Sequence, residues 1–512
     1  PLGTIPEGYI NMIKAGRYED AYELISELNP LPSTCARVCH HPCEAECKRG
    51  LLLDLDKPLA IRTLKRFVTD RVEPYRPVFN RKYDYRVAII GAGPAGITAA
   101  FDLAKKGYEV KVFEAAPKPG GMARKCIPDF RLNKSALQAE FEALENAGIE
   151  IEYNAKVGKN PTIAQLKEKF DAIIVAVGAS KGFMLPVAGL EGNPYRVYDA
   201  VTFMERVNSG MPIWSNGEKP KRKDVDVNIG KKAVVIGGGS VAIDAARTLV
   251  RMGIDKITCV CLESGDDMPA PRSEIDDARE EGVEIICSAS PTKVNCAGTW
   301  VDVESVDFKK VDHIEHDEKG RIKPVLSEDG DFTLQCDSII FAVGQKADVT
   351  QLAAGGGLEL ADGHIKFDDT TLETSVKGVF VAGDVVEARG SIISAMASGR
   401  KAALSVDNML QDRQLSNRIE HTLHSGPQSE WIYRIQLEDV APQQIPKLRY
   451  HDTFEELELG FDERTAVTES RRCMKCGYEN VDTEKCIGCG VCANICPVQA
   501  ITMARSPKEV EQ

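Results

Sequence analysis

The chain of 512 residues carries 64 lysines and arginines against 77 aspartates and glutamates, which gives a formal net charge of −13. Its composition is 43% apolar and 28% charged, as in ordinary soluble proteins, and its length suits about three domains. The negative charge argues against nucleic acid and anionic membranes as partners, and the sequence shows neither a long apolar run nor a signal peptide. We therefore expect a cytoplasmic protein with no nucleic-acid partner and no membrane insertion.

The sixteen cysteines are unevenly distributed along the chain. Four lie in 35–47 and six in 473–496, and tight clusters in a long chain are typical of metal sites rather than of disulfide scaffolds. Others stand in or beside apolar strand-like runs, and we interpret Cys259, Cys261 and Cys287 as small buried hydrophobes. This density of cysteines favours a reducing, anaerobic cell interior.

Residues 1–84 show a helical period of apolar residues and contain the first cysteine cluster. The spacing Cys35-x3-Cys39-x3-Cys43-x3-Cys47 differs from that of zinc fingers. On a helical path this spacing would place the four thiols on one face, where a single 4Fe–4S cluster would need all of them. A zinc site and a helix face with free thiols are the alternatives.

The segment 85–207 opens with a dinucleotide-binding pattern. An apolar strand leads into Gly91-Ala-Gly93-Pro-Ala-Gly96, a helix follows, and a second strand ends at Glu114. The first glycine allows a tight turn, the second lets the backbone approach a pyrophosphate, and the third lets helix and strand pack closely. The helix N-terminus attracts the phosphates, and Glu114 is placed to accept hydrogen bonds from a ribose. A purely structural glycine turn is the alternative.

A second pattern of the same kind lies within 208–338, where a strand, the loop Gly237–Ala242 and a helix lead to Glu263. An acid at this position bonds the 2′-hydroxyl of NAD and repels the 2′-phosphate of NADP, so Glu263 favours NADH. Two alternatives stay open: Glu263 is only a solvated charge at a strand end, or a phosphate is reached by Arg272 or Lys256.

The repeated strand, turn, helix and strand predict an α/β protein with two doubly wound, Rossmann-like domains. Residues 339–412 resume the buried strands and contain Gly383-Asp384, where an acid at a strand end suits a flavin ribityl hydroxyl. A structural role for this pair is the alternative. Residues 413–472 show little periodicity, and we predict an extended linker there.

The last segment, 473–512, contains Cys486-x2-Cys489-x2-Cys492-x3-Cys496-Pro497, the spacing of bacterial ferredoxins for a 4Fe–4S cluster. The pair Cys473-x2-Cys476 precedes it. Six cysteines are two short of two complete clusters, so the pair is either spare or belongs to a second cluster that takes help from elsewhere.

Neither glycine-rich loop has a Cys-x-x-Cys pair beside it, and Cys126 stands alone near the first. We therefore expect no redox-active disulfide next to a flavin. Hydride transfer from a nicotinamide to a flavin depends on orientation more than on acid–base groups, so we predict no catalytic side chain.

Together these residues resemble the small subunit of glutamate synthase and its relatives, the FAD-dependent NAD(P)H oxidoreductase subunits of iron–sulfur complexes. The resemblance covers nearly the whole chain, and the matching stretches are Cys35–Cys47, Gly91–Gly96, Gly120–Met122, Ile127–Leu132, Gly237–Asp244, Met268–Ala270, Ala342–Gln345 and Gly378–Asp384. It implies a flavin domain in two pieces, 85–207 and 339–412, with the NAD(P)H domain inserted between them.

The resemblance also implies which residues bind each cofactor. For FAD these are Gly91, Gly93, Pro94, Ala95, Gly96, Glu114, Gly121, Met122, Arg131, Gly178, Gly383 and Asp384. For NAD(P)H they are Gly237, Gly239, Ser240, Val241, Ala242, Asp244, Glu263 and Gly344. The expected metal ligands are Cys35, Cys39, Cys43, Cys47, Cys486, Cys489, Cys492 and Cys496, with Cys473 and Cys476 as further candidates.

The chain departs from the family pattern at two places. NADPH-using members carry two arginines where this chain has Leu262 and Glu263, which supports NADH. Relatives also carry another cysteine-rich motif upstream of the stretch that matches Pro1–Pro6, and the two motifs share two clusters, so we expect one cluster from the N-terminal cysteines present here.

We predict an electron-transfer subunit that contains FAD and at least two 4Fe–4S clusters. NADH would deliver a hydride to FAD, and single electrons would leave through the clusters to ferredoxin or a partner subunit. The alternatives are an NADPH-dependent glutamate synthase small subunit and a non-catalytic scaffold.

Overall fold

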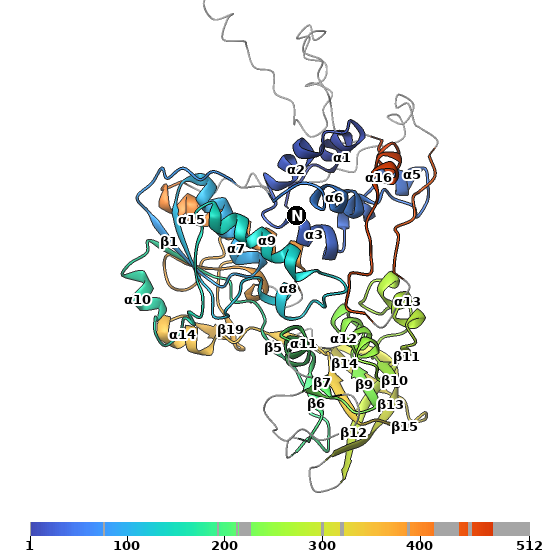
Figure 1. Cartoon of the computed structure of the whole chain (residues 1–512). Helices are drawn as coiled ribbons and strands as arrows, with labels where there is room; N and C mark the ends of the chain where they lie inside the picture. Colours follow the sequence, from blue (N-terminus) through green and yellow to red (C-terminus); the bar gives the residue numbers. More distant parts are fainter. Residues whose placement is uncertain are drawn as a thin grey trace, which may run out of the picture.

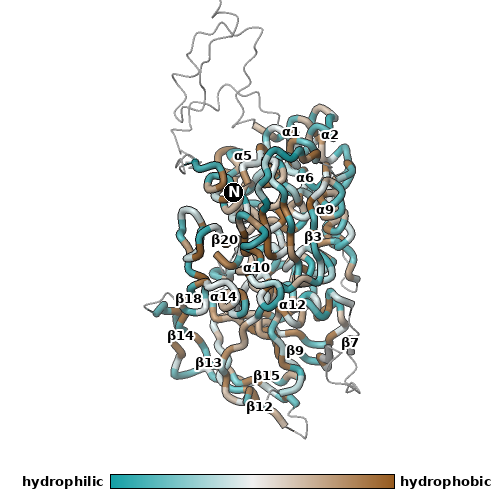
Figure 2. Tube along the Cα trace, turned by 90° about the vertical axis from the view of Figure 1, so that its left-hand side faces the viewer, coloured by the Kyte–Doolittle hydropathy of each residue, from teal (hydrophilic) through white to brown (hydrophobic). Residues whose placement is uncertain are grey.

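The computed structural model describes residues 2–74, 77–191, 194–210, 213–214, 227–297, 302–317, 322–386, 390–413, 440–448 and 453–474. Cys476 and the four-cysteine run that starts at Cys486 lie outside the described residues. Figures 1 and 2, turned by 90° from one another, both show the N-terminal helices at the top and a second α/β part at the bottom, and Figure 1 shows a first α/β part at the left.

The N-terminal part consists of short helices, most of which share one apolar core, as the helical period predicted, whereas Cys35 and Val38 belong to the core of the first α/β part. Its central buried residues are Ile13, Ile25, Leu64 and Phe67. The helices are α1 (Pro6–Lys14), α2 (Tyr18–Ser26), α3 (Pro32–Val38), α4 (Pro42–Ala45), α5 (Lys48–Leu52) and α6 (Ile61–Thr69).

The first α/β part is built on a parallel sheet of five strands in the order β20-β4-β1-β2-β3. These are β1 (Arg86–Ile90), β2 (Glu109–Phe113), β3 (Glu150–Glu152), β4 (Ala172–Val175) and β20 (Val379–Val381). Strand β4 is buried along its whole length, as expected for a parallel sheet covered on both faces. The helices of this part are α7 (Pro94–Lys106), α8 (Gly121–Lys125), α9 (Lys134–Asn146), α10 (Ile163–Lys167), α14 (Thr350–Gly356) and α15 (Ile392–Leu410).

The second α/β part has a parallel sheet in the order β11-β10-β9-β16-β6. The strands are β6 (Val197–Asp199), β9 (Lys232–Ile236), β10 (Lys256–Val260), β11 (Glu284–Ile286) and β16 (Ser338–Phe341), with helices α11 (Ala200–Asn208), α12 (Ser240–Arg251) and α13 (Arg272–Glu280). Since β16 pairs with both β9 and β6, this sheet extends beyond the predicted span 208–338 at both ends, which corrects that boundary.

An antiparallel layer adjoins the second sheet. It consists of β12 (Ala289–Ala297), β13 (Asp302–His316), β14 (Ile322–Leu326) and β15 (Phe332–Gln335). Three pairs of short strands complete the described sheets: β5 (Lys181–Gly182) with β17 (Gln345–Lys346), β7 (Ile213–Trp214) with β8 (Val227–Asn228), and β18 (Leu360–Ala361) with β19 (His364–Ile365). Cys259 and Cys261 are buried, which confirms their interpretation as core residues, and Cys287 is partly buried.

The described stretches 440–448 and 453–474 contact all three parts, and Figure 1 shows them in orange to red between α16 and α13. Lys447 pairs with Asp277 of α13 at 2.7 Å, and Glu456 pairs with Arg66 of α6 at 3.0 Å. The predicted extended linker is corrected at its end, because α16 (Glu463–Ser470) forms there and packs on the N-terminal core. Across the part of the chain that is described, no helix is both long and apolar enough to cross a membrane.

Candidate functional site

The two glycine-rich loops open into one cavity of about 680 Å³. Its wall takes Gly91 and Gly93 from the first loop, and Ser240 and Val241 from the second. Other predicted cofactor residues that line it are Pro94, Ala95, Glu114, Gly121, Met122, Arg131, Gly178, Asp244, Gly383 and Asp384. The cavity therefore joins the two predicted nucleotide sites, a size and position suited to bound cofactors.

The first loop has the shape that a pyrophosphate requires. Gly91 has φ +109°, and a Cβ there would lie 2.4 Å from the carbonyl oxygen of Ala176. Gly93 differs, because the nearest atom to a Cβ there is Cα of Gly121 at 3.8 Å. The space in front of Gly93 is thus open, and α7 begins directly after it, so its unpaired N–H groups face that space. This cradle fits a phosphate.

Glu114 is a buried acid whose carboxylate is held by backbone N–H groups. One oxygen accepts from Ala92 at 2.7 Å, inside the first loop, and the other accepts from Ala116 at 2.8 Å. Each carboxylate oxygen can accept a further hydrogen bond. Glu114 therefore orders the loop and lines the cavity where a ribose diol is predicted.

Gly383-Asp384 reaches the same cavity from far along the chain. Strand β20 lies beside β4 in parallel, so their carboxyl ends meet at one edge of the sheet. Oδ2 of Asp384 lies 3.9 Å from the position of a Cβ on Gly178. The N–H of Gly383 donates to the hydroxyl of Ser398 on α15 at 3.0 Å, which fixes the turn.

The second loop repeats this geometry. Gly237 has φ +141°, and a Cβ there would lie 2.3 Å from the carbonyl oxygen of Ala342. Gly239 has open space around its Cβ position, and α12 begins at the next residue. Ala242 is fully buried, as expected for the residue that lets helix and strand pack closely. The second loop therefore fits the phosphates of a second dinucleotide.

Both Glu263 and Arg272 lie near this loop. Oε2 of Glu263 is 2.8 Å from the position of a Cβ on Gly238, and the N–H of Ala270, two residues before Arg272, donates to the carbonyl of Gly238 at 3.1 Å. Lys256 is excluded as a phosphate ligand, because it stands at the amino end of β10, about 13 Å from the end that carries the loop.

Arg131 and Asp244, predicted to bind different cofactors, form an ion pair with one another. The Arg131 guanidinium donates to both carboxylate oxygens of Asp244 at 2.8 Å and to Glu274 at 2.7 Å. Both residues line the cavity, so they join its flavin-side wall to its nicotinamide-side wall. Glu274 was missed in the sequence because its importance depends on how the two parts dock.

The four N-terminal cysteines do not share a helix face, so that prediction is wrong. Helix α3 ends at Val38, and α4 begins with Pro42 after His41 adopts φ 44°. Cys35 is fully buried in the core of the first α/β part, with Sγ 3.5 Å from Sδ of Met396, whereas Cys43 and Cys47 pack against the core of the N-terminal helices. Burial raises the pKa of Cys35 to about 12 and that of Cys43 to about 11.

Cys39 also packs against the core that holds Cys35, but like Cys43 and Cys47 it is only partly buried, whereas Cys35 is fully buried. We therefore keep Cys39, Cys43 and Cys47 as the candidate N-terminal ligands. Within the described ranges, no three side chains of histidine, cysteine, aspartate or glutamate are grouped as a metal site. Thiols are the ligands that iron–sulfur clusters take, so the chemistry of the three residues fits.

The segment that carries Cys39 reaches the cofactor cavity. Val38 and His40, which flank this cysteine, both line the cavity wall. Burial lowers the pKa of His40, which favours the neutral imidazole. Sequence patterns had no signal for this contact, because it depends on packing between two domains.

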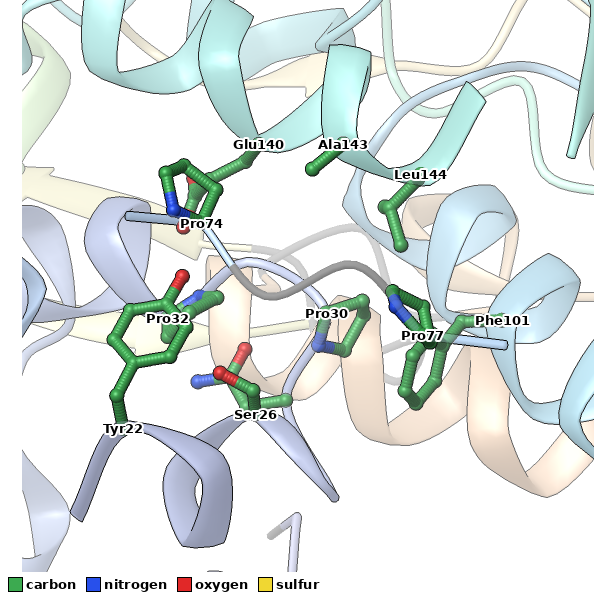
Figure 3. Close-up of a pocket in the computed structure, with 11 residues that line it drawn as sticks. Tyr22, Ser26, Pro30, Pro32, Pro74, Pro77, Phe101, Glu140, Ala143 and Leu144 are labelled. Carbon is green, nitrogen blue, oxygen red and sulfur yellow. The ribbon is translucent and has the colours of Figure 1, made fainter. Parts of the chain in front are cut away.

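Glu140 of α9 fixes the start of α3. Its carboxylate accepts from the N–H of Ser33 and from the hydroxyl of Thr34 at 2.6 Å. Figure 3 shows Glu140 beside a small cavity lined by Pro30, Pro32 and other residues. Burial raises the pKa of Glu140 to about 7. This contact attaches the cysteine segment to the first α/β part.

Cys126 is the cysteine that lines the cavity among the described residues. Burial raises its pKa to about 12, and its Sγ lies 3.9 Å from the carbonyl oxygen of Val201. A protonated thiol is a poor nucleophile, so Cys126 is not prepared for thiol–disulfide exchange.

Comparison with protein families gives three matches along the chain. The pyridine nucleotide-disulphide oxidoreductase family matches 85–402, the 4Fe-4S cluster domain II of dihydropyrimidine dehydrogenase matches 1–76, and a 4Fe-4S binding domain matches 479–502. The predicted combination of a flavoprotein fold with an iron–sulfur domain at each end is confirmed.

Relatives agree with this arrangement. The β subunit of an NADP(+)-dependent formate dehydrogenase from Moorella thermoacetica is 34% identical over 91% of this chain and 68% of its own length. The PreT subunit of NAD-dependent dihydropyrimidine dehydrogenase from Escherichia coli K12 is 36% identical, over 80% and 90% of the two chains. Their names include both nucleotides, so they leave the choice between NADH and NADPH open.

Among solved structures, FprA of Mycobacterium tuberculosis in complex with NADPH has the same fold, with 18% identity and a TM-score of 0.53 over 64% of this chain and 85% of that one. The family match covers more than half of the chain, and the fold and both loops agree with it. The chain therefore belongs to the pyridine nucleotide-disulphide oxidoreductase family.

Proposed function

We propose that this chain transfers a hydride from NADH to FAD and passes the two electrons singly through 4Fe–4S clusters to ferredoxin or a partner subunit. The observation that carries the proposal is the common cavity, which Gly93 lines from one side and Ser240 from the other. Hydride transfer needs the reacting atoms about 3–3.5 Å apart, and one shared cavity permits that approach.

On the flavin side, we assign the pyrophosphate to Gly91, Gly93 and the start of α7, with Glu114 at the ribose and Asp384 at the ribityl chain. Bound FAD would supply the conversion of a two-electron donor into two single electrons. The chain's own contribution is to hold the nucleotide still, since the loop is already ordered by Glu114 through backbone hydrogen bonds.

On the nicotinamide side, we assign the pyrophosphate to Gly237, Gly239 and the start of α12. Glu263 favours NADH, because its carboxylate lies against the loop and would repel a 2′-phosphate. Arg272 could attract the 2′-phosphate of NADPH, but this attraction is weak, because its side chain is 63% exposed and pairs with Asp276 at 3.3 Å.

The exit for electrons is assigned to the cysteine segment. Cys39 stands between two residues of the cavity wall, which supports transfer from FAD to a cluster on Cys39, Cys43 and Cys47. Two of the relatives are named as subunits of larger enzymes, which supports a partner subunit.

The proposal is tested on anaerobically purified protein by measuring FAD, iron and sulfide, and then by low-temperature EPR after reduction with excess NADH. We expect bound FAD and the signals of reduced 4Fe–4S clusters. Reduced flavin without any cluster signal would limit the chain to two-electron chemistry and contradict the proposal.

A further inference from the structure

Arg472 is a fully buried arginine at the end of α16. Its guanidinium donates to Glu469 at 2.7 Å, to Asp54 at 3.0 Å and to the carbonyl of Lys57 at 2.7 Å. Burying a guanidinium is costly unless its donors are paired. The two terminal nitrogens of Arg472 are paired in this way, whereas its buried Nε has no hydrogen-bond partner among the described residues. The paired contacts fix one arrangement of the chain. They join the end of α16 to the loop that follows α5.

A second arginine closes the contact from the other side. Arg49 donates to the carbonyl of Arg472 at 3.1 Å and pairs with Asp54 at 2.7 Å. Arg49 lies two residues after Cys47, and Arg472 directly precedes Cys473. The network therefore places the start of the C-terminal cysteine region beside the end of the N-terminal one, and Figure 1 shows α16 next to α5.

Three leucines are exposed at this place. Leu51, Leu52 and Leu55 are 49%, 37% and 71% exposed and belong to α5 and the turn after it, between Arg49 and Lys57. Neighbouring exposed apolar side chains of this kind mark an interaction surface. We call these three residues the leucine face.

We propose that the leucine face is the docking surface for residues 475–512 of the same chain. The described chain ends at Met474, which is buried, and the family match to a 4Fe-4S binding domain begins at 479. Five residue steps span at most about 18 Å, so this domain cannot lie far from the anchored Arg472. The leucine face is an exposed apolar surface next to that anchor, since Leu55 follows Asp54, which binds Arg472.

This inference rests on the proposed function and adds a route to it. Docking at the leucine face would bring the ferredoxin-type cysteines next to Cys43 and Cys47, which pack on the same core as Cys473. Electrons would then pass from FAD to the N-terminal cluster and onward within one chain. A redox partner would take them from the 475–512 module.

A photocrosslinking amino acid at position 55 tests the docking directly in the full chain. We expect crosslinks from position 55 to peptides of 475–512. The same group at Ile322, a 39% exposed residue of β14 at the other end of the molecule, should give none of them. No link from position 55 to 475–512, or equal links from both positions, would overturn the proposal. So would links found mainly between chains in a mixture of isotope-labelled and unlabelled protein.

A surface variant adds a functional readout. Leu51→Glu combined with Leu55→Glu should weaken the spin coupling that broadens the EPR signals of the reduced clusters, while NADH bleaches the flavin at the wild-type rate. Unchanged broadening would contradict the docking. The crosslinks form without electron transfer, so they test the docking independently of the proposed function. Failure of NADH to reduce the flavin in the wild type would contradict the proposed function and leave the docking result unchanged.

Discussion

Arg131 and Asp244 form an ion pair across the cofactor cavity, with the Arg131 guanidinium 2.8 Å from both carboxylate oxygens of Asp244. Asp244 lies in α12, whose first residue lines the cavity, and Arg131 follows α8 on the flavin side. Glu274 binds the same guanidinium at 2.7 Å. These contacts set how the nicotinamide side of the cavity faces the flavin side.

The first prediction concerns this ion pair. Arg131→Met should slow flavin reduction by NADH at least tenfold, about 1.4 kcal/mol, because it frees the two sides of the cavity and leaves two carboxylates unpaired. As a positioning effect, it should lower the limiting rate more than it raises the apparent Kd for NADH. Arg131→Lys keeps one charge and should recover part of the rate in rapid-mixing experiments. A wild-type rate in Arg131→Met would contradict this role.

The second prediction concerns nucleotide choice. Glu263→Ser should raise kcat/KM for NADPH relative to NADH about tenfold or more, because it removes the charge that repels a 2′-phosphate. Arg272→Ala is the matched variant and should reduce only the use of NADPH. The ratio of the two kcat/KM values is the measurement, and an unchanged ratio in Glu263→Ser would remove this residue as the selector.

The third prediction separates binding from folding in the second loop. Gly239→Val should leave the melting temperature near that of the wild type, because no atom lies within 4 Å of the added Cβ. It should nevertheless raise the KM for NADH at least tenfold by filling the phosphate cradle. Gly237→Val should instead destabilise the protein, since its Cβ would meet Ala342 and its φ is +141°. Equal melting temperatures and equal KM values for the two variants would contradict the assignment.

The fourth prediction concerns the N-terminal cysteines. Cys35→Ala should retain the iron content of the wild type, because Cys35 is buried against Met396 in another core. Cys43→Ala should lose the iron of the N-terminal cluster. Iron and sulfide analysis of the two purified variants measures this difference. Loss of iron in Cys35→Ala at unchanged folding, judged by circular dichroism, would restore the four-cysteine site predicted from the spacing.

The fifth prediction concerns pH. Burial raises the pKa of Glu140 to about 7 from its ordinary 4.5, so the folded protein holds a proton that the unfolded chain releases. The free energy of unfolding should therefore fall by about 3 kcal/mol as the pH rises from 4.5 to 7. Glu140→Gln should remove this dependence in urea unfolding, whereas Glu142→Gln, exposed on the same helix, should keep it. The same pH dependence in both variants would contradict the assignment.

The local parts of the fold were predictable from the sequence. The strands expected directly before the two glycine-rich loops, at 86–90 and 232–236, coincide with β1 and β9. A short apolar run that ends in a glycine-rich turn before a helix usually forms a buried parallel strand. The membership of β6 and β16 in the second sheet was not predictable, since an apolar run does not reveal which sheet it joins.

The candidate site shows the same division. Glu114 and both glycine loops lie where their patterns placed them, because each depends on one local turn. The predicted arrangement of the N-terminal cysteines was wrong, because cysteines separated by three residues share a face only on an unbroken helix. Pro42 interrupts the helix here. The pairing of Arg131 with Asp244 depends on how two domains dock, which no local pattern encodes.

In the proposed function, NADH reduces FAD across the shared cavity and iron–sulfur clusters then take the electrons. Anaerobic rapid mixing of the loaded protein with NADH, and separately with NADPH, follows the flavin band and the broad iron–sulfur absorbance together. We expect fast flavin bleaching by NADH, at least tenfold slower bleaching by NADPH, and a later fall of the iron–sulfur absorbance. A flavin that neither nucleotide bleaches, in protein that holds FAD and clusters, would contradict it.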